Sequence, residues 1–419
     1  MKATIYRSSL DGSLRAPPSK SYTHRALFCS ALAQGESTLH SPLICDDTRA
    51  TSDALSKVGV ATEWNTGAAG VSRSGELKKP SDVIFCGKSG TTLRFMMAIC
   101  ATTPYDAEIS GDPSLLKRPV KDLALALGAL GAYCTSNLGY PPVHVKGPIE
   151  GGTATIPGNV SSQYVSALLL AAPSADASVE VSIVGRLESK SYVQMTLDMQ
   201  NRFGVRVDAS DDLTEFHVRG QTYRPSEVEI EGDWSSAASL LAGAAVAGDK
   251  VSIQRLEQKS LQADRHLLDI FKHVKARVSQ DSHSVTAEKS QIDAAEVDVS
   301  DCPDLFPVTC VLCASAHGIS TIRGIQRLRI KESNRVQAMS DGLKQMGIKT
   351  EESEDSFTIN GGKPCKAVID PHRDHRIAMA FAVLGLGTEV TILDAECVGK
   401  SYPSFWSDLQ SLGARVKAA

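Results

Sequence analysis

The hydrophobic pattern of the chain alternates between two kinds of helical segment. Residues 19–33 ("SKSYTHRALFCSALA") and 234–248 ("WSSAASLLAGAAVAG") are apolar on almost every face of a helix. Residues 46–59 ("DDTRATSDALSKVG") instead have one apolar and one polar face. A helix that is apolar all round must be buried, whereas an amphipathic helix covers a core. The pattern therefore predicts buried parallel helices inside a shell of sheets and amphipathic helices.

The apolar helices recur at a constant interval. Each follows a short strand-like segment and a small-residue turn, and the interval from one helix start to the next is about 70 residues. A period of this size is the mark of a repeated supersecondary unit, so we expect six repeats. The expected N-cap residues of the six helices are Ser19, Ser89, Ser161, Ser235, Asp304 and Asp374.

A second series of positions marks the ends of the amphipathic helices. A glycine there supplies the positive φ that a helix C-terminus commonly needs. In the fourth repeat, Lys275 takes the place of the glycine in "IFKHVKARV". Each repeat is thus expected to run helix, strand, helix and then strands. The glycines of the other repeats are Gly59, Gly131, Gly204, Gly347 and Gly413.

The sixth repeat reaches the end of the chain before its strands are complete. The strand-like residues 2–16 could complete its sheet. That pairing would join the two ends of the chain in one discontinuous domain. A chain of 419 residues is also too long for a single ordinary domain.

Composition narrows the class of protein. Apolar residues make up 42% of the chain and charged residues 22%, as in soluble globular proteins. The net charge of −4 argues against a general nucleic-acid or membrane-surface binder. No apolar run is long enough to span a membrane, and the N-terminus is too polar for a signal peptide. Ten cysteines without paired spacing indicate a reducing compartment, and we expect a cytoplasmic protein.

Two of those cysteines, Cys310 and Cys313, have the spacing of a metal-binding pair. They lie in an apolar stretch with no second pair and no histidines nearby. We therefore expect them to pack in the core rather than to bind a metal.

Cationic residues occupy the starts of the buried helices, where the positive end of the helix dipole disfavours them. Lys20 and Arg25 fall in the first two turns of their helix. Any one such residue is ordinarily a solvated surface cation. As a set, at the same end of repeated buried helices, they predict a site for one or more polyanionic small molecules. The other members are Lys88, Arg94, Arg373 and Arg376, with Arg118, Lys331 and Arg335 as further candidates.

A family resemblance rests on motifs that run through the whole chain in a fixed order. Singly each is weak, but together they are specific. The chain strongly resembles the 5-enolpyruvylshikimate-3-phosphate synthases, of the enolpyruvyl transferase family. The motifs are "PSKSYTHRALF", "CGKSGTTLR", "LLKRP", "VSSQYVSALL", "ESKSY", "CPDLFP", "RIKESNR", "DHRIAMA" and "GKSYPSF".

The resemblance implies an α/β (α+β) fold, a two-lobed inside-out barrel with three repeats in each lobe, helices inside and sheets outside. It places the crossovers near residues 18 and 231. Lobe one is then residues 1–18 plus 232–419, with the phosphoenolpyruvate side and the catalytic carboxylates. Lobe two is residues 19–231, mainly the shikimate-3-phosphate side. The active site is expected in the cleft between the lobes.

The resemblance also implies the reaction. The 5-hydroxyl of shikimate-3-phosphate attacks C2 of phosphoenolpyruvate, and a tetrahedral adduct then loses inorganic phosphate. This step belongs to chorismate and aromatic amino acid biosynthesis and needs no metal or organic cofactor. The expected partners are these two substrates alone, without nucleic acid or membrane, and the expected state is a monomer. The phosphates and carboxylates of the substrates account for the number of cations.

The family's functional residues transfer onto matching positions of this chain. By resemblance, shikimate-3-phosphate is bound by Lys20, Ser21, Arg25, Ser161, Ser162, Gln163, Ser189, Asp304, Arg327 and Lys331. Phosphoenolpyruvate is bound by Lys20, Lys88, Gly90, Arg118, Gln163, Arg335, Arg376 and Lys400. The catalytic group comprises Asp304, Glu332, Lys20 and His375.

The chemistry gives Asp304 an independent role. The attacking hydroxyl must lose a proton, and a carboxylate within hydrogen-bond reach can accept it. The simpler interpretation of Asp304 is a helix N-cap, and both roles are compatible. Lys20 is a candidate for stabilising or protonating the leaving oxygen, and Glu332 for handling the proton at C3. Which of the two serves which proton stays open.

Some positions depart from the commonest family pattern. Thr23 and His24 stand where many members have Ser and Asn, and Lys88 stands where many have Asn. Arg327 replaces an Asn that touches the shikimate phosphate in some members. These changes leave the reaction class intact and leave open the response to glyphosate, the family's inhibitor.

Two rival functions remain. The sister enzyme that transfers enolpyruvate to UDP-N-acetylglucosamine usually has a loop cysteine near residues 111–119, where this chain has none. A non-catalytic phosphometabolite-binding protein could use the same scaffold, and loss of Asp304 or Glu332 would have favoured it. Both residues are present.

Overall fold

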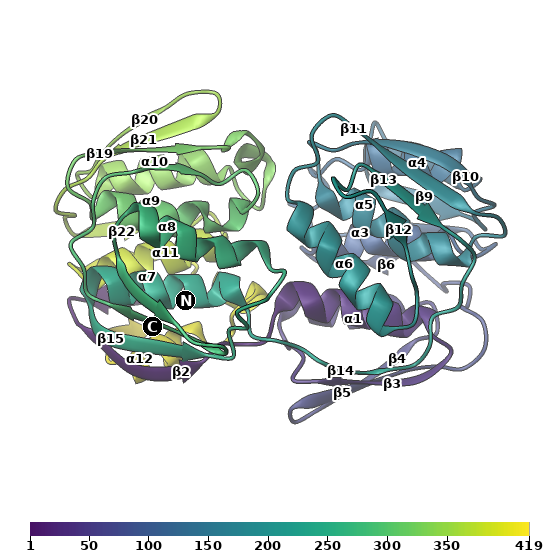
Figure 1. The fold of residues 1–419 in the computed structure, drawn as a ribbon, viewed down its shortest axis with the longest axis horizontal. Coiled ribbons are helices and arrows are strands. Elements are labelled where there is room, and N and C mark those ends of the chain that lie inside the picture. The colour runs from purple at the N-terminus through teal and green to yellow at the C-terminus, as the bar shows by residue number, and fades with distance from the viewer. Residues whose placement is uncertain (419) are drawn as a thin grey trace. The chain divides into compact units, whose positions relative to one another are not determined.

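The structure, a computed structural model, describes residues 1–418 and divides into two compact units (Figure 1). Unit 1 comprises Met1–Pro17 and the chain from Glu231 onward, and unit 2 comprises Pro18–Ile230. Each unit contains three four-stranded sheets, which confirms the six predicted repeats. No helix in the described part of the chain is long and apolar enough to cross a membrane.

Each unit has fully buried helices inside, with sheets and partly exposed helices around them, as the two kinds of helix predict. The strands of unit 2 are β3 (Gly35–His40), β4 (Ala61–Asn65), β5 (Ala68–Arg73), β6 (Ile84–Phe85), β7 (Ala107–Ser110), β8 (Tyr133–Asn137), β9 (Tyr140–Lys146), β10 (Gly152–Pro157), β11 (Val179–Val184), β12 (Asp208–Ala209), β13 (Glu215–Val218) and β14 (Glu227–Glu229). Its helices are α1 (Lys20–Leu32), α2 (Asp46–Ser56), α3 (Gly90–Cys100), α4 (Lys121–Ala129), α5 (Ser162–Ala171), the short 3₁₀ helix η1 (Ala172–Ser174) and α6 (Lys190–Arg202).

Unit 1 repeats the same plan. Its strands are β1 (Ala3–Tyr6), β2 (Leu10–Arg15), β15 (Gly248–Gln254), β16 (Arg277–Gln280), β17 (Ser284–Glu288), β18 (Glu296–Asp298), β19 (Ile319–Arg323), β20 (Lys349–Glu352), β21 (Ser356–Asn360), β22 (Ala367–Ile369), β23 (Val390–Ile392) and β24 (Arg415–Ala418). Its α-helices are α7 (Trp234–Ala247), α8 (Leu267–His273), α9 (Phe306–Ala314), α10 (Arg335–Gln345), α11 (His375–Gly385) and α12 (Phe405–Ser411). Its 3₁₀ helices are η2 (Ala263–His266), η3 (Pro303–Leu305), η4 (Gln326–Ile330) and η5 (Ala395–Lys400).

All six sheets share one topology. In the third repeat, β10 runs parallel to β11, β13 is antiparallel to β11, and β12 is antiparallel to β13. A parallel pair needs a crossover, and here the buried helix α5 lies between β10 and β11 in the chain. The other sheets follow the same order, from β6-β7-β9-β8 to β18-β19-β21-β20.

The N-terminal strands complete two sheets of unit 1. As expected, β1 joins the sixth sheet, where it pairs antiparallel with β23 and β24. Only the first part of residues 2–16 belongs to that sheet, because β2 pairs parallel with β15 in the fourth sheet. The strand that precedes α7 in the chain, β14, pairs instead with β3 in unit 2. β2 therefore takes the position in the fourth sheet that β14 leaves open.

The first helix of each repeat is buried on all sides. Every residue of α9 and of α11 is buried, and so is α7 from Trp234 to Ala245. In unit 2, α1 is buried from Tyr22 to Leu32 although it contains Arg25. Cys310 and Cys313 lie in α9 as buried free thiols, as expected of core residues.

Four of the six expected N-caps are confirmed, and two are wrong. The side chains of Ser19, Ser89, Ser161 and Asp374 each accept a hydrogen bond from a backbone N–H in the first turn of their helix. The cap of α7 is Asp233 instead of Ser235, and its Oδ1 accepts from the Ser236 N–H at 2.6 Å. Asp304 lies within η3, and α9 begins at Phe306 without a side-chain cap. Both displaced residues are thereby available for other polar contacts.

The expected helix ends are confirmed. All five glycines have positive φ, from 78° at Gly347 to 104° at Gly131. Lys275 adopts the same left-handed backbone with φ 55°, although it carries a Cβ. Its ammonium lies 2.7 Å from Asp293 Oδ2, which helps to hold that turn.

Close packing between two helices of unit 1 gives a test of the core. A Cβ at Gly342 in α10 would overlap the ring of Phe381 in α11. We expect Gly342→Ala to lower the free energy of unfolding by about 1–3 kcal/mol, measured by urea denaturation, because overpacking displaces a buried ring.

Gly128→Ala is the matched control. Gly128 also lies within a helix, but a Cβ there would meet nothing within 4 Å. It should raise stability by up to about 1 kcal/mol, because alanine favours a helix over glycine. Equal effects of the two substitutions would show that α10 and α11 do not pack as described.

Candidate active site

The N-termini of the buried helices of unit 2 lie side by side. Gln163 at the start of α5 donates through Nε2 to Thr91 Oγ1 in the first turn of α3, at 2.9 Å. On the other side of α3, Thr92 Oγ1 lies 2.7 Å from Thr51 Oγ1, which lies 2.8 Å from His24 Nδ1 in α1. The positive ends of the three helix dipoles therefore face one region.

Arg25 is a buried cation whose hydrogen-bond acceptors are neutral oxygens. It is 2% exposed. Its Nε donates to Thr196 Oγ1 at 2.8 Å, Nη2 to the Tyr192 carbonyl at 2.7 Å and Nη1 to the Ser21 carbonyl at 3.0 Å. Burial lowers the pKa of Arg25 to about 10. A guanidinium carries five N–H donors, so these three bonds leave donors for an anion.

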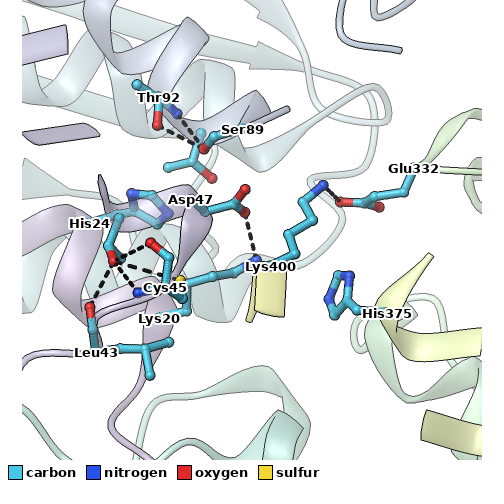
Figure 2. A network of polar contacts seen from close by, with 12 residues as sticks. Lys20, His24, Leu43, Cys45, Asp47, Ser89, Thr92, Glu332, His375 and Lys400 are labelled. Carbon is cyan, nitrogen blue, oxygen red and sulfur yellow. Dashed lines mark hydrogen bonds and ion pairs between the residues drawn. The ribbon is translucent and has the colours of Figure 1, made fainter. Parts of the chain in front are cut away.

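Lys20 forms an ion pair that the sequence analysis did not find. Its Nζ lies 2.9 Å from Oδ2 of Asp47, in the first turn of α2 (Figure 2). Asp46 and Asp47 open "DDTRATSDALSKVG", where acidic residues are typical of a helix start. The position of Asp47 in the sequence is explained by the helix start alone and gives no sign of a contact with Lys20. That contact forms only because α1 packs on α2.

Two further arginines contact the first residues of α3 and α5. Arg94 Nη1 donates to Gln163 Oε1 at 2.5 Å, and its guanidinium lies 5.1 Å from the centre of the Tyr164 ring. The Arg118 guanidinium lies against the first residue of α3, since a Cβ on Gly90 would fall 2.7 Å from Arg118 Nη1. Glycine at this position is what lets the guanidinium approach the helix terminus.

The predicted serines lie at the starts of α5 and α6. Ser161 Oγ accepts from the Gln163 N–H at 3.3 Å, and Ser162 is buried in the first turn of α5. Ser189 precedes α6 with a left-handed backbone, φ 57°. Lys88, just before α3, is exposed.

In unit 1 the helix N-termini also converge, and here a carboxylate lies between them. Asp304 Oδ1 accepts from Arg335 Nη1 at 2.7 Å, and Oδ2 accepts from Arg376 Nη2 at 2.8 Å. Arg376, in the first turn of α11, also donates through Nη1 to Ser235 Oγ in the first turn of α7. The contacts join α7, η3 and α11 at one end, as the charge pattern predicts.

Arg335 is the centre of this cluster. It is 1% exposed, and besides Asp304 it binds Asp374 Oδ2 through Nε and Glu332 Oε2 through Nη2, each at 2.9 Å. Burial lowers the pKa of Arg335, but the three carboxylates outweigh this effect and raise the pKa well above its ordinary value. Asp374 has a second function as the cap of α11, since its Oδ1 accepts from the Arg376 N–H at 3.0 Å.

The charges of the cluster fix the ionisation of Asp304. Burial alone would raise the pKa of its carboxyl, but Arg376, Arg335 and Lys331 hold that pKa below its usual range. Asp304 is therefore ionised at neutral pH. Burial lowers the pKa of Lys331 to about 8, against the attraction of Asp304. Within residues 1–418, no side chain or carbonyl forms a hydrogen bond or ion pair with the Lys331 ammonium.

Glu332 and Lys400 form the second edge of the cluster. Lys400 Nζ lies 3.1 Å from Glu332 Oε1, while Glu332 Oε2 binds Arg335 (Figure 2). His375 is buried as the first residue of α11, with Nδ1 3.9 Å from Asp374 Oδ1. Arg327 lies in η4 and donates through Nη2 to the Ser300 carbonyl at 2.5 Å.

One cation suggested by the charge pattern does not belong to the cluster. The Arg373 side chain is 74% exposed and pairs with Asp394 at 3.5 Å. It precedes α11, and its left-handed φ of 57° accompanies this outward position. A further buried carboxylate, Asp264 in η2, was missed, because "QADRHLL" shows no signal besides that of a helix start.

Comparisons with known proteins agree along the whole chain. The family model for EPSP synthase (3-phosphoshikimate 1-carboxyvinyltransferase) matches residues 6–409. A protein of that name from Dehalococcoides mccartyi strain BAV1 is 40% identical, over 99% of each chain. Another from Methanoculleus marisnigri is 41% identical, over 96% of this chain and 97% of its own.

Solved structures show the same fold. The EPSP synthase of Acinetobacter baumannii superimposes with a TM-score of 0.83 at 27% identity, covering all of both chains. The enolpyruvyl transferase NikO of Streptomyces tendae has a TM-score of 0.82 at 15% identity, which supports the fold alone.

The Arg335 cluster gives a stability prediction. We expect Arg335→Gln to lower the free energy of unfolding by about 3–5 kcal/mol at pH 7, because it leaves the buried Asp374 carboxylate without its cation and removes one of the two cations that bind Asp304 and Glu332. The Asp304 contribution is present above its unfolded pKa of about 3.9 and is lost as pH falls through its lower folded value. The difference in the free energy of unfolding between the parent protein and Arg335→Gln should therefore become smaller as the pH falls. Urea denaturation from pH 3 to pH 7 measures it.

Arg329→Gln is the control for this substitution. Arg329 pairs with Glu352 at 3.0 Å, but both side chains are 31% exposed. Its loss should cost less than about 1 kcal/mol. Arg335→Gln with no greater effect than Arg329→Gln would contradict the cluster.

Proposed function

The chain belongs to the EPSP synthase family, and from that membership and the two clusters we propose that it transfers the enolpyruvyl group of phosphoenolpyruvate to the 5-hydroxyl of shikimate-3-phosphate. Inorganic phosphate is released. One observation carries the proposal: Asp304 is held ionised between Arg335 and Arg376 at the N-termini of buried helices. A base and an anion site then lie in one place.

The cluster in unit 2 suits shikimate-3-phosphate. Its helix N-termini and the buried, neutrally bonded Arg25 favour a ligand with a phosphate and a carboxylate. Lys20 adds a second cation at the start of α1. We assign to this ligand the residues Lys20, Ser21, Arg25, Ser161, Ser162, Gln163 and Ser189, with Asp304, Arg327 and Lys331 from unit 1.

Phosphoenolpyruvate has a carboxylate and a phosphate, and arginine guanidinium groups can bind both through charge-assisted hydrogen bonds. Arg335 and Arg376 each donate an N–H to one oxygen of the Asp304 carboxylate, and a substrate carboxylate can accept from guanidinium groups in the same way. Arg118, held against Gly90 at the positive end of α3, is suited to the phosphate. We assign to this ligand Arg335, Arg376, Lys400, Gly90, Arg118, Gln163, Lys88 and Lys20.

The addition step uses Asp304 as the general base. The 5-hydroxyl loses its proton to the Asp304 carboxylate while its oxygen bonds to C2 of phosphoenolpyruvate. C3 gains a proton, which we assign to the protonated Glu332 carboxyl, and becomes a methyl group. In the free protein the two arginines depress the basicity of Asp304. A substrate carboxylate that shares those guanidinium groups raises it, so the base becomes effective when substrate is bound.

The elimination step reverses the proton movement at C3. The bond from C2 to the phosphate oxygen breaks, the methyl group loses a proton, and the enol double bond forms again. We assign the removal of the methyl proton to Glu332, whose carboxylate pairs with Arg335 and Lys400. Lys20 is assigned to the leaving phosphate, and His375 lines the reacting centre. The cations stabilise the charge as it moves from carbon to phosphate.

The proposal includes a monomeric enzyme of the cytoplasm. All ten cysteines are free thiols, and most of them are buried. Thiols kept reduced are typical of a cytosolic protein. Size-exclusion chromatography with light scattering tests the monomer.

The reaction itself gives the first functional prediction. Mixing the protein with shikimate-3-phosphate and phosphoenolpyruvate should release inorganic phosphate in a coupled colorimetric assay. UDP-N-acetylglucosamine in place of shikimate-3-phosphate should release none. Release with the nucleotide sugar alone would assign the chain to the sister activity, and release with neither acceptor would favour a binding protein.

Asp304→Asn tests the base. The amide keeps hydrogen-bond capacity but cannot accept the hydroxyl proton, so we expect kcat to fall by roughly 10²-fold or more. Affinity for shikimate-3-phosphate, measured by calorimetry, should change by less than about tenfold. Asp301→Asn, an exposed neighbour, is the control. Turnover of Asp304→Asn equal to that of the control would remove Asp304 from this role.

A further inference from the structure

Asp264 is a buried carboxyl to which the proposed reaction gives no role. It lies in η2, just before α8, and is 4% exposed. Its Oδ1 has no hydrogen-bond partner among the described residues. A buried carboxylate oxygen without a donor is costly in the ionised state and much less so in the protonated state.

A chain of polar contacts joins Asp264 to the proposed base. The Ser235 side chain lies beside the Asp264 carboxyl, and its hydroxyl oxygen accepts a hydrogen bond from Arg376 Nη1. The other terminal nitrogen of Arg376, Nη2, donates to Asp304 Oδ2 at 2.8 Å. Asp264 and Asp304 therefore lie at the two ends of one path, with the Arg376 guanidinium in the middle.

The charged groups around Asp264 come from several elements. Asp304 in η3 and Asp233 before α7 repel a negative charge there, while Arg376 in α11 attracts one. The Cys302 thiol lies close by, and burial together with Asp264 raises the pKa of that thiol well above its usual value. For Asp264 itself, burial and the Asp304 charge raise the pKa to about 7, against Arg376 and the Ser235 hydroxyl.

We propose that Asp264 is a positioning residue of the reaction: in its protonated form, and through Ser235, it holds the Arg376 guanidinium toward Asp304 and toward the carboxylate of phosphoenolpyruvate. The inference rests on the proposed function. No covalent step is involved. The only change of state is the gain or loss of one proton at the Asp264 carboxyl.

Ionisation of Asp264 has a defined consequence. A second carboxylate on the path competes with the substrate carboxylate for the charge of Arg376, so binding of phosphoenolpyruvate weakens. By linkage, binding of phosphoenolpyruvate favours the protonated form of Asp264. The catalytic efficiency toward phosphoenolpyruvate should therefore fall as pH rises through about 7.

Asp264→Asn tests the proposal, because the amide resembles the protonated carboxyl and cannot ionise. Between pH 6 and pH 8.5 we expect kcat/KM for phosphoenolpyruvate to fall by about threefold or more in the parent protein. In Asp264→Asn the fall should be absent, with values within about twofold of the parent at pH 6. Asp249→Asn, an exposed aspartate of β15, should keep the parent profile. The same falling limb in Asp264→Asn as in the parent would overturn the proposal.

A second measurement does not depend on turnover. The folded pKa of Asp264 lies above its unfolded value of about 3.9, so its stabilising effect is complete below that pH. This contribution to the free energy of unfolding decreases as the pH rises toward 7 and does not change further at higher pH. The free energy of unfolding of Asp264→Asn should therefore rise relative to the parent between pH 4 and pH 7. A difference that is independent of pH would show that Asp264 ionises normally and would reject the inference.

Ser235→Ala tests the link and covers the case in which Asp264→Asn folds poorly. The substitution removes the hydroxyl that lowers the pKa of Asp264, so the pH at which kcat/KM begins to fall should move upward. A fall at the same pH as in the parent protein would contradict the path. If the parent protein shows no turnover with either acceptor, the proposed function fails. The stability titration then decides separately whether Asp264 binds its proton as described.

Discussion

Everything in the site depends on one constraint: helices that are apolar on all faces have to be buried, and in each unit they are buried with their N-termini together. The contact of Gln163 with Thr91 shows this in unit 2, and the contact of Arg376 with Ser235 shows it in unit 1. Aligned helix dipoles then create a positive region without any ligand. The repeated unit that forms the fold therefore also concentrates positive charge in one region of each unit.

The two units differ in the groups that surround their buried cations. In unit 2, Arg25 is buried among neutral oxygens. In unit 1, Arg335 is surrounded by the carboxylates of Asp304, Glu332 and Asp374. The first arrangement is suited to holding an anion, and the second is suited to moving protons in a strong positive field. An addition and elimination reaction between two anionic substrates needs both properties.

The repeats and the helix termini could be predicted because they depend on local sequence. The cations of the site could be predicted as a set, because a lysine or arginine at a helix start has the wrong sign for its position. Which residue caps α7, and which sheet receives β2, could not be predicted in this way. Asp233 lies two residues before the expected cap, and the fourth sheet takes β2 because β14 has paired with β3.

The residues that were missed are carboxylates whose local roles are ordinary. Asp47 and Asp264 lie at helix starts, where acids are common, and only tertiary packing brings them to Lys20 and Ser235. Arg373 was predicted to belong to the cluster because it precedes a buried helix in the sequence. That prediction fails because its side chain lies in solvent.

The affinity of the protein for shikimate-3-phosphate alone, measured by titration calorimetry, tests the central claim most directly. If the converging helix ends and the neutrally bonded Arg25 form an anion site, Arg25→Gln should weaken binding by about tenfold to hundredfold. Arg206→Gln, an exposed arginine of the same unit, should leave it unchanged. Equal affinities for the two variants would contradict the account.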